Sequence, residues 1–139
     1  MSDLTPGFAS GKELAALQLP PVDLVTLQRY ADASGDYALI HLDTDAARSA
    51  GFPGVIAHGL LVMAYLGRAV GEWFPDGQLR EFGCRFMAVT LIGDRLTCLG
   101  RVMTTTEGAS EQVVDLDLRV VDQRGEIKLK GSARIAMVE

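Results

Sequence analysis

The sequence predicts an α+β fold in which a curved antiparallel sheet wraps around one long helix. Residues 56–74 carry apolar side chains around most of a helical circumference, and such a helix requires burial on several sides. From Leu79 onward, apolar and polar residues alternate with period two between glycine-containing turns, which is the pattern of half-buried strands joined by hairpins. The apolar face of this sheet must cover something, and the long helix is the only candidate.

Length, composition and charge narrow the class of protein. A chain of 139 residues with 48% hydrophobic residues predicts one compact domain, residues 1–139, with a substantial core. A net charge of −5 disfavours nucleic acid as a partner, because a phosphate backbone is bound by clustered Lys and Arg. The N-terminal residues Met1–Pro6 lack the basic and apolar regions of a signal peptide, and residues 56–74 contain charges that disfavour a membrane span. We therefore expect a cytoplasmic protein.

The N-terminal half is predicted to contain a short strand and two helices before the long helix. Residues 14–19 can form the strand, which the Pro20-Pro21 pair ends. Asp23 is a good N-cap for the first helix, and Gly35 fits the left-handed position that ends one. Asp43 is the expected N-cap of a second, shorter helix that ends at Gly51.

The C-terminal half is predicted to contain four strands. Phe82, Cys84 and Phe86 alternate with polar residues in the first. The second runs over residues 95–105 after a Gly93-Asp94 turn, the third covers residues 114–120, and the last covers residues 127–137. Exposed-face cations of these strands, among them Arg80, Arg85, Arg101, Lys128 and Lys130, are expected to be solvated or to meet an anionic substrate.

An aspartate and a histidine lie close together after the first helix. Asp36 follows the helix end directly, an extended segment of residues 38–40 is expected next, and His41 comes after it. A carboxylate and an imidazole can hold a water molecule between them and exchange protons near neutral pH. The alternative for Asp36 is an ordinary turn or capping residue.

The segment Tyr30–His41 resembles the hydratase motif of the MaoC-like dehydratases and (R)-specific enoyl-CoA hydratases. An aromatic residue opens the motif, Ser34-Gly35-Asp36 follow, and Ile40-His41 close it. Further matches are Ala47, the stretch Ile56–Leu61, Arg85-Phe86 and Gly93-Asp94, so the resemblance covers roughly the whole chain. Two positions depart from the family: Tyr37-Ala38 replaces Asn-Pro, and Val89 replaces a common proline.

The resemblance implies a hot-dog fold and the reversible hydration of trans-2-enoyl thioesters, on coenzyme A or acyl-carrier protein, to (R)-3-hydroxyacyl thioesters. Asp36 and His41 would be catalytic, and the amide of Gly59 would bind the thioester oxygen. This agrees with the chemistry, because unpaired N–H groups at a helix start favour an anion and glycine allows close approach.

Four other residues are candidates for the substrate pocket, each with an alternative. Ser34 can instead end the helix, and Met63 can instead be core. For His58, a cap or packed wall is favoured over a proton carrier. Tyr37 can turn into the pocket or cover the helix end, and we expect the inward position because a buried tyrosine is favourable when its hydroxyl has a partner.

No cofactor or metal is expected. His41 and His58 lack the spacing of a metal motif, and Cys84 and Cys98 fall in apolar strand patterns that indicate buried thiols. A homodimer is expected, because sheet edges would otherwise be open, and a heterodimer is the alternative. Two other functions stay open: a hot-dog acyl-CoA thioesterase, and a non-catalytic or partner-dependent subunit of a heteromeric dehydratase.

Overall fold

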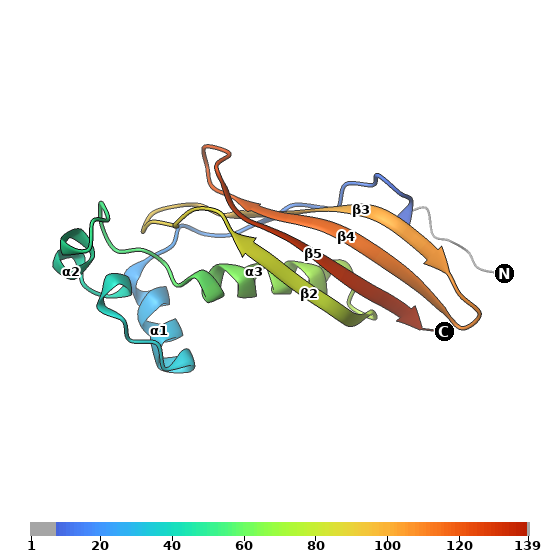
Figure 1. Ribbon diagram of the computed structural model, residues 1–139, viewed down its shortest axis with the longest axis horizontal. Coiled ribbons are helices and arrows are strands. Elements are labelled where there is room, and N and C mark those ends of the chain that lie inside the picture. The colour runs from blue at the N-terminus through green and yellow to red at the C-terminus, as the bar shows by residue number, and fades with distance from the viewer. Residues whose placement is uncertain (1–7, 139) are drawn as a thin grey trace.

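The computed structural model describes residues 8–138, in which a five-stranded antiparallel sheet packs against a long helix (Figure 1). The N-terminal segment that lacks signal-peptide features lies outside the described residues. The strand order is β1-β3-β4-β5-β2. The strands are β1 (Leu17–Gln18), β2 (Gln78–Phe86), β3 (Thr97–Glu107), β4 (Glu111–Val121) and β5 (Ile127–Val138). A curved sheet against one long helix is the hot-dog fold, as the sequence predicted.

Four helices precede β2 within the described residues. They are α1 (Leu24–Ser34), the 3-10 helix η2 (Leu39–His41), α2 (Thr44–Ser49) and α3 (Gly59–Trp73). In Figure 1, α1 and α2 lie at one end of the molecule, and α3 runs from that end along the sheet. No helix within residues 8–138 is long and apolar enough to cross a membrane.

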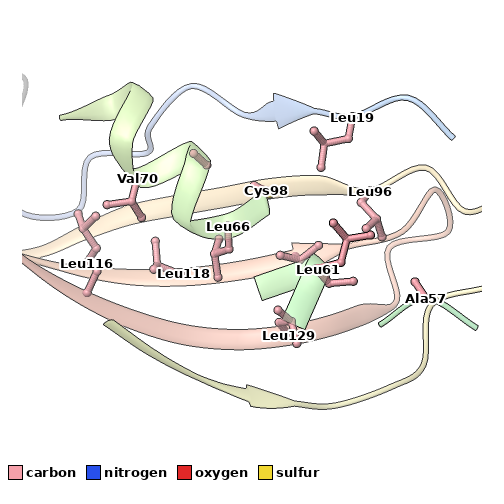
Figure 2. Packing of buried hydrophobic residues seen from close by; sticks show 14 of the residues in the cluster. Leu19, Ala57, Leu61, Leu66, Val70, Leu96, Cys98, Leu116, Leu118 and Leu129 are labelled. Atoms are coloured by element: carbon pink, nitrogen blue, oxygen red, sulfur yellow. The ribbon is translucent and has the colours of Figure 1, made fainter. Parts of the chain in front are cut away.

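The core lies between α3 and the inner face of the sheet. Figure 2 shows Leu61 and Leu66 of α3 among Leu118 of β4 and Leu129 of β5, and all four are buried. Full burial of a leucine side chain contributes about 1.5–3 kcal/mol, so each of these leucines stabilises the packing of the helix on the sheet. The period-two prediction for the strands is therefore confirmed where it faces α3.

Both predicted N-caps are confirmed. Asp23 accepts a hydrogen bond from the Thr26 N–H at 2.8 Å, and this bond lowers the pKa of the Asp23 carboxyl. Asp43 accepts one from the Asp45 N–H at 3.3 Å. Gly35 has φ 79°, the left-handed conformation that ends α1.

Three local predictions were wrong. The first strand is only Leu17–Gln18, not residues 14–19, although neighbouring backbone bonds continue along β3. The segment before His41 is the 3-10 helix η2 rather than extended chain. The long helix begins at Gly59 rather than at Ile56, because Ile56 pairs with Leu91 in an isolated bridge.

Lys128 of β5 also differs from expectation, because it is buried rather than solvated. Lys128 is 2% exposed, and its Nζ donates a hydrogen bond to the Val89 carbonyl oxygen at 2.8 Å. Three carboxylates surround it: Glu126 in direct contact, Asp122 at 3.4 Å and Asp94 at 3.8 Å. The alternation of residues could not show that the loop after β2 folds over this cation.

Candidate active site

Asp36 is held in place by short-range hydrogen bonds just past the end of α1. Its N–H donates to Ser34 Oγ at 3.2 Å. One carboxylate oxygen, Oδ1, accepts from the Ala38 N–H at 3.1 Å, which closes an Asx turn. The other oxygen, Oδ2, faces His41, and about half of the Asp36 side chain, 52%, is exposed.

His41 presents one ring nitrogen to this carboxylate. Its Nδ1 lies 2.8 Å from the Ile56 carbonyl oxygen, which can only accept a hydrogen bond, so Nδ1 carries the proton. In the neutral ring, Nε2 is therefore an acceptor, and it lies 4.0 Å from Asp36 Oδ2. A water molecule to one side of the pair, about 2.8 Å from each atom, can donate one hydrogen to each. The structure thus brings together the two residues that the sequence singled out.

His58 packs directly against this pair. Its ring stacks on the ring of His41, with centroids 4.0 Å apart and planes at 26°. The Tyr30 ring packs against the His58 ring in an edge-to-face arrangement, with centroids 4.8 Å apart. Its Nε2 lies 3.1 Å from the backbone carbonyl oxygen of Asp36, while its buried Nδ1 has no hydrogen-bond partner within the described part of the chain. His58 occupies the N-cap position of α3 without a side-chain capping bond, and it packs as part of a cavity wall, the second of the two structural roles expected for it.

Two cavities meet at these residues. The first has a volume of about 360 Å³ and is lined by His41 and by apolar residues of the long helix and the sheet, with Val62 and Leu129 among them. The second, about 330 Å³, is lined by Asp36 and His58. Gly59 and Phe86 line both cavities, so the Asp36–His41 gap opens toward space on two sides.

Gly59 is the first residue of α3, and its N–H has no partner within the helix. The first intrahelical bonds come from Leu61 and Val62 to the His58 carbonyl. A Cβ at position 59 would lie 2.9 Å from Cε1 of Phe86, which shows how closely the ring approaches this backbone. The Gly59 N–H makes no hydrogen bond within residues 8–138, and together with the helix dipole it favours negative charge at this point.

Asp36, His41 and His58 also form the one group of three metal-ligand side chains found within residues 8–138, with candidate atoms within 4.8 Å of one another. The geometry does not fit a metal ion. The lone pairs of two stacked rings lie in nearly parallel planes about 4.0 Å apart, whereas the ligands of one ion must converge on it at about 2.0–2.1 Å. The arrangement fits proton transfer better than coordination.

The remaining predicted pocket residues are distributed differently. Ser34 lines the second cavity, while Met63 packs against the core and lines neither cavity. The inward position of Tyr37 is wrong for this chain: the residue is 56% exposed and its hydroxyl donates to Asp32 Oδ1 at 2.8 Å. This bond to a carboxylate raises the pKa of the Tyr37 hydroxyl. Tyr37 therefore covers the end of α1.

Phe86 is the residue of the site that the sequence analysis missed as a candidate. Alternation marked it only as one of three apolar positions in a half-buried strand, yet it is 52% exposed. Its place at the last residue of the strand was the available signal, because a side chain there extends past the sheet toward the start of the packed helix.

The chain is similar in sequence and structure to proteins of one family. The MaoC like domain matches residues 9–123. The mitochondrial 3-hydroxyacyl-[acyl-carrier-protein] dehydratase of Arabidopsis thaliana is 26% identical over 73% of this chain, which spans 61% of that protein.

Two solved structures show the same fold. The R-hydratase PhaJ1 of Pseudomonas aeruginosa, in its unliganded form, is 27% identical with a TM-score of 0.83, covering 94% of this chain and 81% of that one. The ChsH1-ChsH2 complex of Mycobacterium tuberculosis gives a TM-score of 0.81 at 21% identity, over 93% and 98% of the two chains. The match over residues 9–123, more than half of its length, shows that the chain belongs to the MaoC-like domain family.

Proposed function

We propose that the protein hydrates trans-2-enoyl thioesters to (R)-3-hydroxyacyl thioesters, and catalyses the reverse dehydration. The observation that carries the proposal is the 4.0 Å separation of Asp36 Oδ2 and His41 Nε2, two acceptors that a single water beside them can bridge. A carboxylate and a neutral imidazole arranged in this way make that water a donor to both. Its oxygen lone pairs are then free to attack carbon.

The reaction follows the flow of charge. The water oxygen bonds to C3 of the enoyl group while one of its protons passes to the Asp36–His41 pair, and a proton reaches C2. Electron density moves from the C2–C3 double bond onto the thioester oxygen. The Gly59 N–H and the start of α3 stabilise that oxygen as an enolate, and one such donor is typically worth about 10²–10³ in kcat. The pair ends the cycle in its starting protonation state, because one proton is taken and one is returned.

The relatives support the substrate class and the stereochemistry. The Arabidopsis relative is a dehydratase of 3-hydroxyacyl groups on acyl-carrier protein, and the Pseudomonas neighbour is an R-hydratase. A dehydratase and a hydratase correspond to the two directions of the reaction proposed here. The (R) configuration assigned here rests on the second of them.

The cavities support a division of the substrate into two ends. The apolar lining near Val62 and Leu129 suits an acyl chain. Met87 lines this cavity and also a second, open hollow that Arg85 and Lys130 line. Both cations are exposed, and they lie directly opposite each other on β2 and β5. Two opposed cations attract a phosphate group, so this hollow suits the phosphate of coenzyme A or of a carrier-protein arm.

A dimer is part of the proposal. The edge strand β2 and the cavity rim expose apolar side chains, including Leu60, Leu79, Phe86 and Met87, each about half exposed or more. An open edge of this kind favours pairing with another chain. The partner is a second copy in our proposal. A different subunit is the alternative, supported by the ChsH1-ChsH2 complex among the structural neighbours.

The test is turnover of crotonyl-CoA, longer 2-enoyl-CoA substrates and the same acyl groups on carrier protein. We expect the 2-enoyl absorbance to disappear and chiral chromatography to give the (R)-3-hydroxy product. A parallel thiol reagent measures free coenzyme A. Thiol release from saturated acyl-CoA would instead favour a thioesterase, and absence of turnover on every substrate would favour a non-catalytic subunit.

A further inference from the structure

We propose that His58 is a positioning residue that holds Asp36 and His41 in the geometry needed to bind the attacking water. This inference rests on the proposed function, and it assigns His58 a different role from substrate contact. Three observations carry it: a hydrogen bond to the backbone of Asp36, a stacked contact with His41, and an unpaired ring nitrogen.

The hydrogen bond joins the start of α3 to the end of α1. The Asp36 carbonyl oxygen accepts, so His58 Nε2 must carry the proton, at 3.1 Å. The other bonds on Asp36 come from within the same turn, namely from Ser34 and Ala38. Among the hydrogen bonds of residues 8–138, only the bond from His58 reaches Asp36 from another helix. It therefore fixes the turn relative to the rest of the site.

The stacked contact fixes the plane of the second water-binding group. His41 is restrained in its ring plane by the bond from Nδ1 to Ile56, and across its face by His58 at 4.0 Å. Tyr30 of α1 packs edge-on against His58 and holds it in place. Rotation of the His41 ring would break this contact, so Nε2 keeps facing Asp36.

The unpaired nitrogen indicates that packing alone does not account for an imidazole at this position. With its proton on Nε2, His58 leaves a bare Nδ1 that is buried, and the residue is only 2% exposed. A buried acceptor without a partner is unfavourable. A phenylalanine would avoid the unpaired nitrogen but lacks the Nε2 donor. An amide side chain has a donor but lacks the ring. Of these three side chains, only the imidazole supplies both the donor and a flat face, and we expect the donor to contribute more, because the Ile56 carbonyl already restrains the His41 ring that the flat face contacts.

The first experiment compares three variants that separate these contributions. The amide nitrogen of glutamine reaches about as far as Nε2, and that of asparagine only as far as Nδ1. We expect His58→Gln to keep kcat within about fivefold of wild type, while His58→Asn and His58→Phe lose roughly 30- to 100-fold, the scale of a misplaced catalytic group. KM should change by less than about threefold in all three.

The kinetics of these variants distinguish a positioning role of His58 from substrate binding and from a purely structural role. A His58→Gln variant as impaired as the other two would overturn the proposal, since the bond to Asp36 would then not matter. A rise in KM with kcat kept would show that His58 binds substrate instead. Thermal unfolding of the variants is the control. A structural role alone predicts that kcat follows the melting temperature, whereas we expect His58→Gln and His58→Asn to melt alike and differ in kcat.

The second experiment needs no activity. The chain contains only two histidines, so long-range ¹H–¹⁵N spectra of the labelled protein, with His58→Gln for assignment, report both tautomers. At a pH where both rings are neutral, we expect His58 as the Nε2–H tautomer and His41 as the Nδ1–H tautomer. Identical tautomers would overturn the inference. A wild-type protein with opposite tautomers and no turnover would instead refute the proposed function while leaving the arrangement of the rings established.

Discussion

Replacing Asp36 by Asn tests the water-binding geometry most directly. Asp36 Oδ1 accepts a hydrogen bond from the Ala38 N–H, and an asparagine keeps this bond by turning its amide oxygen to the same place. Its NH₂ group then occupies the position of Oδ2, 4.0 Å from His41 Nε2. An acceptor is thereby exchanged for a donor, and the water can no longer donate to both sides.

The magnitude follows from what is lost. The variant removes the carboxylate charge and one of the two acceptors that activate the water, so kcat for crotonyl-CoA hydration should fall by about two to four orders of magnitude. At 1.36 kcal/mol per tenfold, this is about 2.7–5.4 kcal/mol of activation free energy. Half of the Asp36 side chain is exposed, so little folding stability should be lost.

The assay is the decrease of 2-enoyl absorbance with purified protein, and the matched control is Asp32→Asn. Asp32 belongs to the same helix end and bonds the Tyr37 hydroxyl, and an asparagine oxygen can still accept that bond. The control should stay within about twofold of wild type. An Asp36→Asn variant that keeps more than a tenth of the wild-type kcat, with an unchanged circular dichroism spectrum, would refute the assignment of Asp36 to the water.

The remaining predictions concern assembly, specificity, stability and thiol chemistry. Light scattering should give twice the 14.9 kDa chain mass, and a monomer mass alone would contradict pairing through β2. Tyr37→Phe should leave relative kcat/KM across crotonyl to dodecenoyl thioesters unchanged, because the ring lies outside the cavities; a shifted optimum would argue for an inward ring. Lys128→Met should lower the free energy of unfolding by about 3–5 kcal/mol in urea titrations, because three carboxylates lose their buried cation. The control Lys130→Met, at an exposed position, should change the free energy of unfolding by less than about 0.5 kcal/mol. Burial raises the pKa of the Cys98 thiol to about 12 and also raises the pKa of Cys84, so thiolate forms only well above neutral pH. At pH 8 a thiol reagent should therefore modify Cys84 slowly and Cys98 only after unfolding, and rapid labelling of both in the native protein would contradict this.

Much of the fold could be predicted because its signals are local. The N-cap at Asp23, the left-handed Gly35 and the alternation of β4 each depend on a few neighbouring residues, and each was confirmed. The pairing of Asp36 with His41 was also predictable, because both lie within one turn-containing segment. A carboxylate and an imidazole at this spacing are suited to proton exchange through a shared water.

Most of the errors, though not the one at Tyr37, depend on a segment far away in the chain. Lys128 is buried because the loop after β2 crosses it, and the long helix starts late because Ile56 pairs with Leu91. The contact of His58 with Asp36 spans 22 positions and leaves no periodic trace in the sequence. Tyr37 was misplaced because its hydroxyl partner, Asp32, lies one helical turn back on the outer surface.

The separation of the catalytic pair from the wall of the first cavity has a consequence for engineering and evolution. Asp36 and His41 come from one short stretch after α1, while Met87, Val89 and Thr90 of the cavity wall come from a loop about 50 positions later. A library that randomises this loop leaves the stretch around the pair untouched. Position 90 is the exception, because its carbonyl accepts the Ala57 N–H close to the start of α3 and restrains the backbone that carries Gly59. Variation at positions 87 and 89 should therefore yield new chain-length preferences at nearly constant turnover, whereas backbone-altering changes such as proline at position 90 should reduce turnover for every acyl chain alike.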